Sequence, residues 1–384
     1  MKDASHDDHD GRGADALIHR EILQIGALML IAVVSFFATR AVAANNREQT
    51  FRDAEAWFAR GQQLMAAGRV EDAIASLRRA SVRNRYERKY ALALARALSQ
   101  KGDTEAARAA LLTLREASPE DAEVNLALAR LASQRQDVTE ALRFYHNTLY
   151  APWSADAAEE RREVRFELID FLLRHDQGGR ALSELLAASA DLPDQADAHI
   201  RVGQLFARAG DGRHALDQYE RALHLAPTNR LALAGAGTSA FSLGDFQLAG
   251  GYLHRVPDDM DDVTRTREVV DLVLSSDPLA RRVGSVERRR RVAASMDYLD
   301  ERLAACRPAG PAMEQPHSPA TLEQEAASLR ERLKASTPLE QDAIEASVDL
   351  FGRIEQYVSK TCPPPTARDQ ALTLIARTHA LDSR

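Results

Sequence analysis

The residues best suited to molecular recognition in this 384-residue chain form two copies of one short pattern. The segments LALARALSQ, residues 92–100, and LALARLASQ, residues 126–134, lie 34 residues apart. In each segment a leucine and an arginine are four residues apart, so on a helix they share one face. The guanidinium groups of Arg96 and Arg130 suit carboxylate or phosphate groups. One hypothesis is that they grip an acidic or C-terminal group of an extended peptide. The alternative is that both are solvated surface arginines.

Sequence signatures of enzymes and of metal centres are missing. The chain has no Gly-x-Ser-x-Gly elbow, no His-Glu-x-x-His motif, no Walker loop and no Cys-x-x-Cys pair. Its two cysteines, Cys306 and Cys362, are too few for a four-cysteine zinc site. Gly235-Ala-Gly237 has a superficial likeness to a dinucleotide-binding loop, but no strand precedes it. We therefore predict no catalytic residue, no metal ligand and no cofactor.

The composition narrows the class of protein further. With 45% hydrophobic and 28% charged residues, the chain is globular in type and long enough for two or three domains. Its 57 acidic residues outnumber the 50 Lys and Arg, for a formal net charge of −7. Binding of nucleic acid over the whole surface is therefore not expected.

A 34-residue repeat runs through the middle of the chain. Counted from Ala54, frame position 20 holds Ala in every copy, position 8 holds Gly or Ala in five copies, and position 15 holds Gly in four. The copies begin at 54, 88, 122, 162, 196 and 230, with six extra residues at 156–161. Small residues let two helices approach closely, and Gly at position 15 makes the turn between them. Six helix pairs over 54–263 are predicted.

This pattern resembles the tetratricopeptide repeat (TPR) family. The best copy, from Ala196, carries the family's residues at eight positions: His199, Gly203, Phe206, Gly210, Ala215, Tyr219, Ala222 and Pro227. The resemblance implies an all-α fold, a right-handed α-solenoid of about six TPR helix pairs with a concave groove. Gln136 and Asp176 depart from the family at the turn position, and the sixth copy ends poorly at Asp261.

The resemblance also implies where a partner binds. In similar proteins the first helix of each pair faces the groove, and frame positions 2, 5, 9, 12 and 13 commonly touch a bound peptide. Here the peptide-groove candidates at those positions are Phe58, Gln62, Lys89, Leu92, Arg96, Gln100, Leu126, Arg130 and Gln134. The Lys-Asn pattern of carboxylate-clamp TPR proteins is absent, so a chaperone-tail specificity is not implied. Position 9 of the fourth copy is Asp170, which confines the basic strip to earlier copies.

An uncharged apolar stretch, ILQIGALMLIAVVSFFAT, lies near the N-terminus at residues 22–39. As a helix it spans roughly 27 Å, close to the thickness of a bilayer core. We predict a transmembrane helix at 22–40, after a polar acidic tail at 1–21 and before a juxtamembrane linker at 41–53. A cleaved signal peptide is the main alternative, because Ala41-Val42-Ala43 has the small-x-small form of a cleavage site. A buried helix is the third reading.

The orientation in the membrane follows from the short tail. Positive charges on the two sides of the span are nearly balanced, so the positive-inside rule does not decide. A short tail before one span ordinarily stays inside. We therefore expect a single-pass inner-membrane protein with a cytoplasmic N-terminus and a periplasmic or extracellular body.

The C-terminal region is expected to be helical, with capping helices at 264–306, a Pro-rich linker at 307–320 and a helical region at 321–384. The arginine run 288–291 is interpreted as a salt-bridged, solvated helix, with contact to lipid or nucleic acid as the alternative. In an exported body Cys306 and Cys362 have the option of a disulfide. In the cytoplasm both stay free thiols.

These features predict a non-enzymatic, membrane-anchored TPR scaffold that binds a protein or peptide partner at the bacterial cell envelope, and no nucleic acid. One alternative is an accessory subunit of an envelope polysaccharide biosynthesis or secretion complex. Another is an adaptor that faces the cytoplasm.

Overall fold

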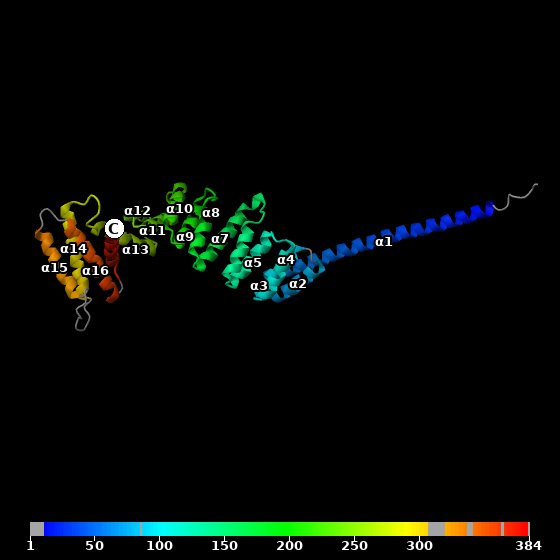
Figure 1. The fold of residues 1–384 in the computed structure, drawn as a ribbon, viewed down its shortest axis with the longest axis horizontal. Coiled ribbons are helices and arrows are strands. Elements are labelled where there is room, and N and C mark those ends of the chain that lie inside the picture. The colour runs from blue at the N-terminus through cyan, green and yellow to red at the C-terminus, as the bar shows by residue number, and fades with distance from the viewer. Residues whose placement is uncertain (1–10, 85–86, 306–318, 336–340, 362–364, 383–384) are drawn as a thin grey trace, which may run out of the picture. The chain divides into compact units, whose positions relative to one another are not determined.

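The computed structural model describes residues 11–84, 87–305, 319–335, 341–361 and 365–382, with side chains from Leu28 onward (Figure 1). All regular structure in these ranges is helical. The chain forms two compact units, with the boundary between Val164 and Arg165.

The first unit is built from one very long helix and five shorter ones. They are α1 (Gly11–Ala66), α2 (Val70–Arg83), α3 (Arg88–Lys101), α4 (Thr104–Ala117), α5 (Ala122–Gln134) and α6 (Val138–Leu149). A 3-10 turn, η1 (Ala155–Ala157), leads into α7 (Ala158–Arg174), in which the unit boundary falls. The end of α1 pairs with α2, and α3 and α5 pair with the helices that follow them, as the frame from Ala54 predicts.

The second unit contains three further pairs and a C-terminal bundle. Its helices after α7 are α8 (Gly178–Ser189), α9 (Ala196–Arg208), α10 (Gly212–Leu225), α11 (Arg230–Ser242), α12 (Phe246–Leu253), α13 (Asp261–Ser276), α14 (Ser285–Ala305), α15 (Pro319–Ala335), α16 (Gln341–Thr361) and α17 (Ala367–Asp382). One hydrophobic core lies among α7 to α13, and a second joins α13 to α17. Helix α13 serves both, because Val270 packs in the first core and Val269 in the second.

The turn inside each helix pair has the same backbone conformation in all six copies. Frame position 15 has a positive φ at the four predicted glycines, Gly68, Gly102, Gly210 and Gly244. It also has a positive φ at Gln136, 58°, and at Asp176, 55°. The left-handed region costs a residue with a Cβ roughly 1–2 kcal/mol. The backbone at frame position 15 is therefore left-handed even where the residue has a Cβ, and Asp176 holds this position in a fourth copy counted from residue 162.

The residue after this turn caps the second helix in four copies. Asp103, Asp137, Asp211 and Asp245 occupy frame position 16, and each side chain accepts a hydrogen bond from an amide three residues on, at 2.9–3.3 Å. An N-cap of this kind stabilises a helix by typically about 1 kcal/mol. These aspartates are a second sequence signal of the repeat, one residue after the turn position.

Close approach of helices explains the small residues at frame position 8. A Cβ added to Gly61 would lie 2.6 Å from Leu77, and one added to Gly237 would lie 2.4 Å from Leu253. Gly235 packs against the ring of Tyr219, and a Cβ added to Gly235 would lie 2.3 Å from Cζ of that ring. The glycines that superficially suggested a dinucleotide loop are thus packing positions inside helix α11.

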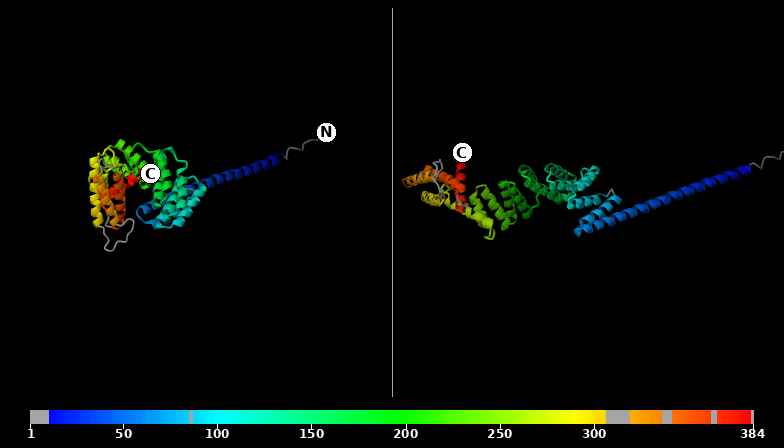
Figure 2. Two further views of the ribbon diagram at one scale, coloured as in Figure 1. Left: turned by 60° about the vertical axis from the view of Figure 1, so that its left-hand side comes forward. Right: turned by 90° about the horizontal axis from the view of Figure 1, so that it is seen from below.

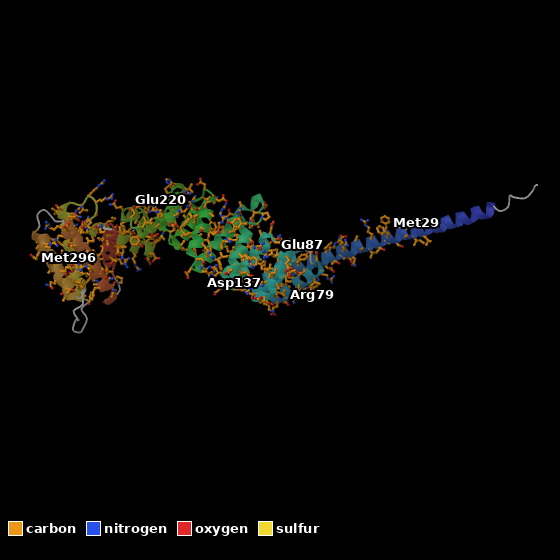
Figure 3. All side chains as sticks on the ribbon, in the orientation of Figure 1. Met29, Arg79, Glu87, Asp137, Glu220 and Met296 are labelled. Carbon is orange, nitrogen blue, oxygen red and sulfur yellow. The ribbon has the colours of Figure 1, made fainter. Side chains whose placement is uncertain are left out.

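Helix α1 continues without a break from Gly11 to Ala66, so the residues assigned to the linker at 41–53 are helical (Figure 2). Its apolar stretch is uncovered by the rest of the described chain: Met29 and Phe37 are 66% and 61% exposed. Figure 3 shows Met29 projecting from the isolated part of this helix. By length and composition, α1 contains one segment able to cross a membrane, a property that a signal sequence shares.

The arginine run of α14 ties the C-terminal bundle together. Arg291 donates to the carbonyls of Leu274 and Asp277 at the end of α13, at 3.0 and 2.8 Å. Arg289 donates to the carbonyl of Leu333 in α15, and Arg290 pairs with Glu287. The run therefore satisfies helix-terminal carbonyls and an acidic neighbour within the bundle. Cys306, Cys362 and nearly all of the Pro-rich linker lie outside the described residues.

A buried acidic pair lies in the same bundle. Asp369 of α17 is 1% exposed and accepts hydrogen bonds from Arg302 and Tyr298 of α14 and from the amide of Thr366. Glu355 of α16 is 3% exposed, and its Oε1 has no hydrogen-bond partner. Burial, and then the charge of Asp369, raises the pKa of Glu355 to about 8. Glu355 is therefore held in its protonated form at neutral pH.

Candidate partner-binding surface

The first helices of the three pairs in the first unit lie side by side. The last part of α1 contacts α3, and α3 contacts α5. Hydrogen bonds link residues about one repeat apart: Lys89 Nζ lies 2.9 Å from Glu55 Oε2, and Ser99 Oγ donates to Gln134 Oε1 at 2.8 Å. The first link joins position 2 of two successive copies, and the second joins position 12 to position 13. The predicted candidates of successive repeats are therefore on one face.

Burial divides the nine candidates into two groups. Phe58 and Leu92 are buried, 9% and 2% exposed, and Leu126 is half-buried. The exposed candidates are Gln62, Lys89, Arg96, Gln100, Arg130 and Gln134. The surface open to a partner is therefore polar, with the apolar members supporting it from beneath.

Arg96 belongs to a charged network between α3 and α5. Its side chain is 60% exposed, and Nη2 lies 2.7 Å from Glu123 Oε1. Arg88 pairs with the other oxygen of Glu123 and with Asp121. The network thus contains two positive guanidinium groups and two negative carboxylates, so its net charge is zero. An acidic ligand must compete with Glu123 for Arg96. The repeat spacing gives no sign of this contact, because Arg96 and Glu123 occupy different frame positions on different helices.

At the N-terminal end of this face, Glu55 is held as a carboxylate. A hydrogen bond from the Tyr90 hydroxyl at 2.7 Å and the neighbouring Lys89 lower the pKa of Glu55. The Tyr90 ring packs on Phe58 with the two ring centroids 5.0 Å apart. Buried aromatic contacts therefore fix the position of the acidic and basic groups above them.

The corresponding helices of the second unit carry different chemistry. Asp170 of α7 pairs with Arg208 of α9 at 2.7 Å, and Leu231 of α11 is 54% exposed. The pattern Leu-x-x-x-Arg-x-x-Ser-Gln is confined to α3 and α5. Among the described residues there is no group of three or more His, Cys, Asp and Glu able to hold a metal ion.

The paired helices, the left-handed turns at one frame position and the glycine contacts define an α-helical repeat protein. Sequence profiles of the tetratricopeptide repeat match residues 64–131 in the first unit and residues 166–229 and 203–261 in the second. Residues 64–131 and 166–261 therefore carry tetratricopeptide repeats, and the all-α fold predicted from the sequence is confirmed.

Several solved structures are similar to this chain. YrrB, described as a TPR protein with an unusual peptide-binding site, is 20% identical to this chain. The match covers 51% of this chain and 95% of the YrrB chain, with a TM-score of 0.35. PilF of Pseudomonas aeruginosa is 16% identical, covering 55% and 91%, with a TM-score of 0.39. PilW, a type IV pilus biogenesis factor, is 16% identical, covering 53% and 91%, with a TM-score of 0.38. No curated protein matches the chain in sequence.

Proposed function

We propose that this chain is a non-enzymatic, membrane-anchored scaffold that binds an acidic peptide segment of a partner protein on the face formed by α1, α3 and α5. The observation that carries this proposal is the row of exposed polar side chains at equivalent frame positions, with Arg96 at its centre. Guanidinium groups form paired, charge-assisted hydrogen bonds with carboxylates. The buried Phe58 and Leu92 below them hold the backbone that presents these groups.

The charged network gives this proposal an unusual test. Glu123→Gln removes the internal competitor of Arg96, so it should strengthen binding of an acidic partner severalfold. The double variant Arg96→Ala/Arg130→Ala should weaken binding about tenfold or more, because two charge-assisted contacts are lost. Cross-linking of the full chain in cells, followed by purification and titration of the captured protein, measures both effects.

Arg78→Ala is a matched control, since Arg78 is an exposed arginine on α2 away from this face. Its affinity for the captured protein should equal that of the natural chain. Unchanged affinity in the Arg96→Ala/Arg130→Ala chain would remove the binding role of this face. Weaker binding after Glu123→Gln would show that Glu123 contacts the partner instead of competing with it.

Anchoring in the inner membrane with a periplasmic body is the second element of the proposal. It is supported by the apolar stretch of α1, which the rest of the described chain leaves exposed from Leu28 onward. In intact cells, a membrane-impermeant maleimide should label Cys306 and Cys362, either directly or after reduction of a disulfide. Labelling only after the inner membrane is breached would place the body in the cytoplasm, and a chain that lacks residues 1–43 would indicate a cleaved signal.

A further inference from the structure

The second unit contains a small pocket that the proposed function does not use. It has a volume of about 350 Å³ and lies between the connection from α8 to α9 and the C-terminal end of α10. Helices α8 and α10 both contact α9, which places these segments together (Figure 1). Small-molecule pockets usually measure about 300–1,000 Å³. The volume of this pocket therefore suits a small organic molecule.

Two opposite charges in the lining of this pocket have no partner. Asp194, in the connection from α8 to α9, and Arg221, near the end of α10, are both exposed. Neither side chain makes an ion pair or a hydrogen bond with a residue that the structure describes, so they do not pair with each other. Among the described residues that line the pocket, they are the only Asp, Glu, Lys or Arg. The pocket therefore offers one carboxylate to a cation and one guanidinium group to an anion.

A buried histidine contributes a further polar atom to the pocket. His199 of α9 is 7% exposed and belongs to the lining. Its Nδ1 lies 2.8 Å from Oε1 of the buried Gln218, an atom that can only accept, so Nδ1 carries a proton. When the ring is neutral, its Nε2 then has a free lone pair. No described residue forms a hydrogen bond with Nε2, so this acceptor is available to a ligand.

Apolar side chains form another part of the lining. Leu225 is 42% exposed at the end of α10, Leu192 is half-buried in the connection before α9, and Ala190 is exposed. An occupant that covers these side chains gains from the removal of apolar surface from water. Inorganic phosphate would pair with Arg221 but leave Asp194 and the apolar residues unmatched. A small zwitterion with an apolar side chain matches all parts of the lining.

We propose that this pocket binds a free α-amino acid with an apolar side chain. The α-ammonium group donates to Asp194 and to Nε2 of His199, and the α-carboxylate accepts from Arg221. The apolar side chain packs on Leu192 and Leu225. Hydrogen bonds between ionised groups are roughly twice as strong as those between neutral groups. The pocket lies in the second unit and the face of α1, α3 and α5 in the first, so the chain carries a small-molecule site separate from its proposed protein-binding face.

Saturation-transfer NMR on the full chain in detergent micelles tests this proposal, with free L-amino acids as the probes. Leucine, isoleucine, valine, methionine and phenylalanine should receive magnetisation from the protein, whereas serine, lysine and glutamate should receive much less. Isothermal titration of L-leucine into the same sample then gives its affinity. If none of the five apolar amino acids binds the natural chain, the proposal is wrong.

Variants of the two exposed charges, combined with altered ligands, assign each contact. Asp194→Asn and Arg221→Gln should each weaken binding of L-leucine at least about tenfold, because each removes a charge-assisted contact. N-acetyl-L-leucine lacks the ammonium group and L-leucinamide lacks the carboxylate, so both should bind the natural chain similarly weakly. Asp194→Asn should not weaken N-acetyl-L-leucine further, and Arg221→Gln should not weaken L-leucinamide further. Equal affinity for N-acetyl-L-leucine and L-leucine would indicate a site for the C-terminus of a peptide and refute the amino-acid assignment.

Matched controls separate this pocket from its surroundings and from the proposed function. Arg213 on α10 and Asp261 at the start of α13 are exposed and do not belong to the lining. Arg213→Gln and Asp261→Asn should therefore leave the affinity for L-leucine within about twofold. Arg96→Ala/Arg130→Ala, which tests the proposed function, should also leave it unchanged. If Arg213→Gln or Asp261→Asn reduced the affinity as much as the pocket variants, net charge and not the pocket would determine binding.

Discussion

Replacing Glu355 by glutamine is expected to make the C-terminal bundle more stable at pH 8 and to leave it nearly unchanged at pH 5. The carboxyl of Glu355 is buried beside Asp369 and keeps its proton in the folded chain, with a pKa of about 8. A glutamine amide has the same shape and carries no charge at any pH. It supplies an N–H donor where the protonated acid supplies its O–H.

The direction of this effect follows from the two pKa values of Glu355. Between the ordinary value of 4.5 and the folded value of about 8, the unfolded chain releases a proton that the folded chain keeps. The stability of the natural bundle therefore falls as the pH rises through this window. At about 1.4 kcal/mol per pH unit, the loss is at most about 5 kcal/mol. Asp369 acts in a lower range, because its pKa is lowered, and its stabilising contribution is lost only in acid.

Hydrogen exchange measured by mass spectrometry on the full chain reports this effect locally, in peptides from α16 and α17. The natural chain should lose protection steeply between pH 5 and pH 8 after correction for the intrinsic exchange rate. Glu355→Gln should show a much shallower loss. Glu345→Gln, an exposed position on the same helix, should keep the natural slope. Parallel curves for all three chains would mean that Glu355 ionises normally in the folded bundle.

Gly237→Ala is expected to destabilise the repeats of the second unit by about 2–3 kcal/mol. The added Cβ would lie 2.4 Å from Cδ2 and 2.6 Å from Cγ of Leu253, with the carbonyl oxygen of Ala249 at 3.4 Å. Leu253 is fully buried, so it has little room to move. The two helices α11 and α12 must separate slightly to admit the methyl group.

Gly251→Ala on α12 is the matched control, because a Cβ there meets nothing within 4 Å. Alanine is the better helix former, so this change should stabilise the chain by up to about 1 kcal/mol. Urea denaturation, with hydrogen exchange of α11 and α12 to locate the transition, measures both changes. If the two variants behaved alike, the space around residue 237 would be larger than the structure indicates.

The repeats were predictable because their signals recur at a fixed spacing. Position 15 adopts the left-handed conformation even where Gln136 and Asp176 replace glycine, so the frame carries more information than any one residue. The short α12, which ends at Leu253, accounts for the poor ending of the sixth copy, since α13 already begins at Asp261. The Asp caps at position 16 recur at the same spacing, so they too are predictable from the sequence.

The candidate surface was only partly predictable. Spacing alone placed Arg96 and Arg130 on neighbouring helices, and the hydrogen bonds between α3 and α5 confirm that these helices are adjacent. Spacing does not say which side chains the neighbours cover, so the burial of Leu92 and the pairing of Arg96 with Glu123 required the structure.

The buried acid left a fainter trace in the sequence. Glu355 follows Phe351 by four residues and Val348 by seven, which places a carboxyl in the apolar stripe of α16. An acidic residue in an apolar stripe is the sequence feature that indicates a buried carboxyl at this position. Its partner Asp369 lies on the next helix, beyond the Pro363–Pro365 run, where no periodic pattern links the two residues.

The uninterrupted course of α1 has a geometrical consequence for the proposed anchor. A helix turns by about 100° and advances by about 1.5 Å with each residue. The direction in which the first repeat points around the membrane normal is therefore set by the number of residues in 41–53. Adding one residue there would rotate the face of α1, α3 and α5 about the helix axis by about 100°. Adding seven residues would nearly restore its orientation and move it about 10 Å farther from the membrane. The length of segment 41–53 would then set both the direction that the binding face points and its distance from the membrane.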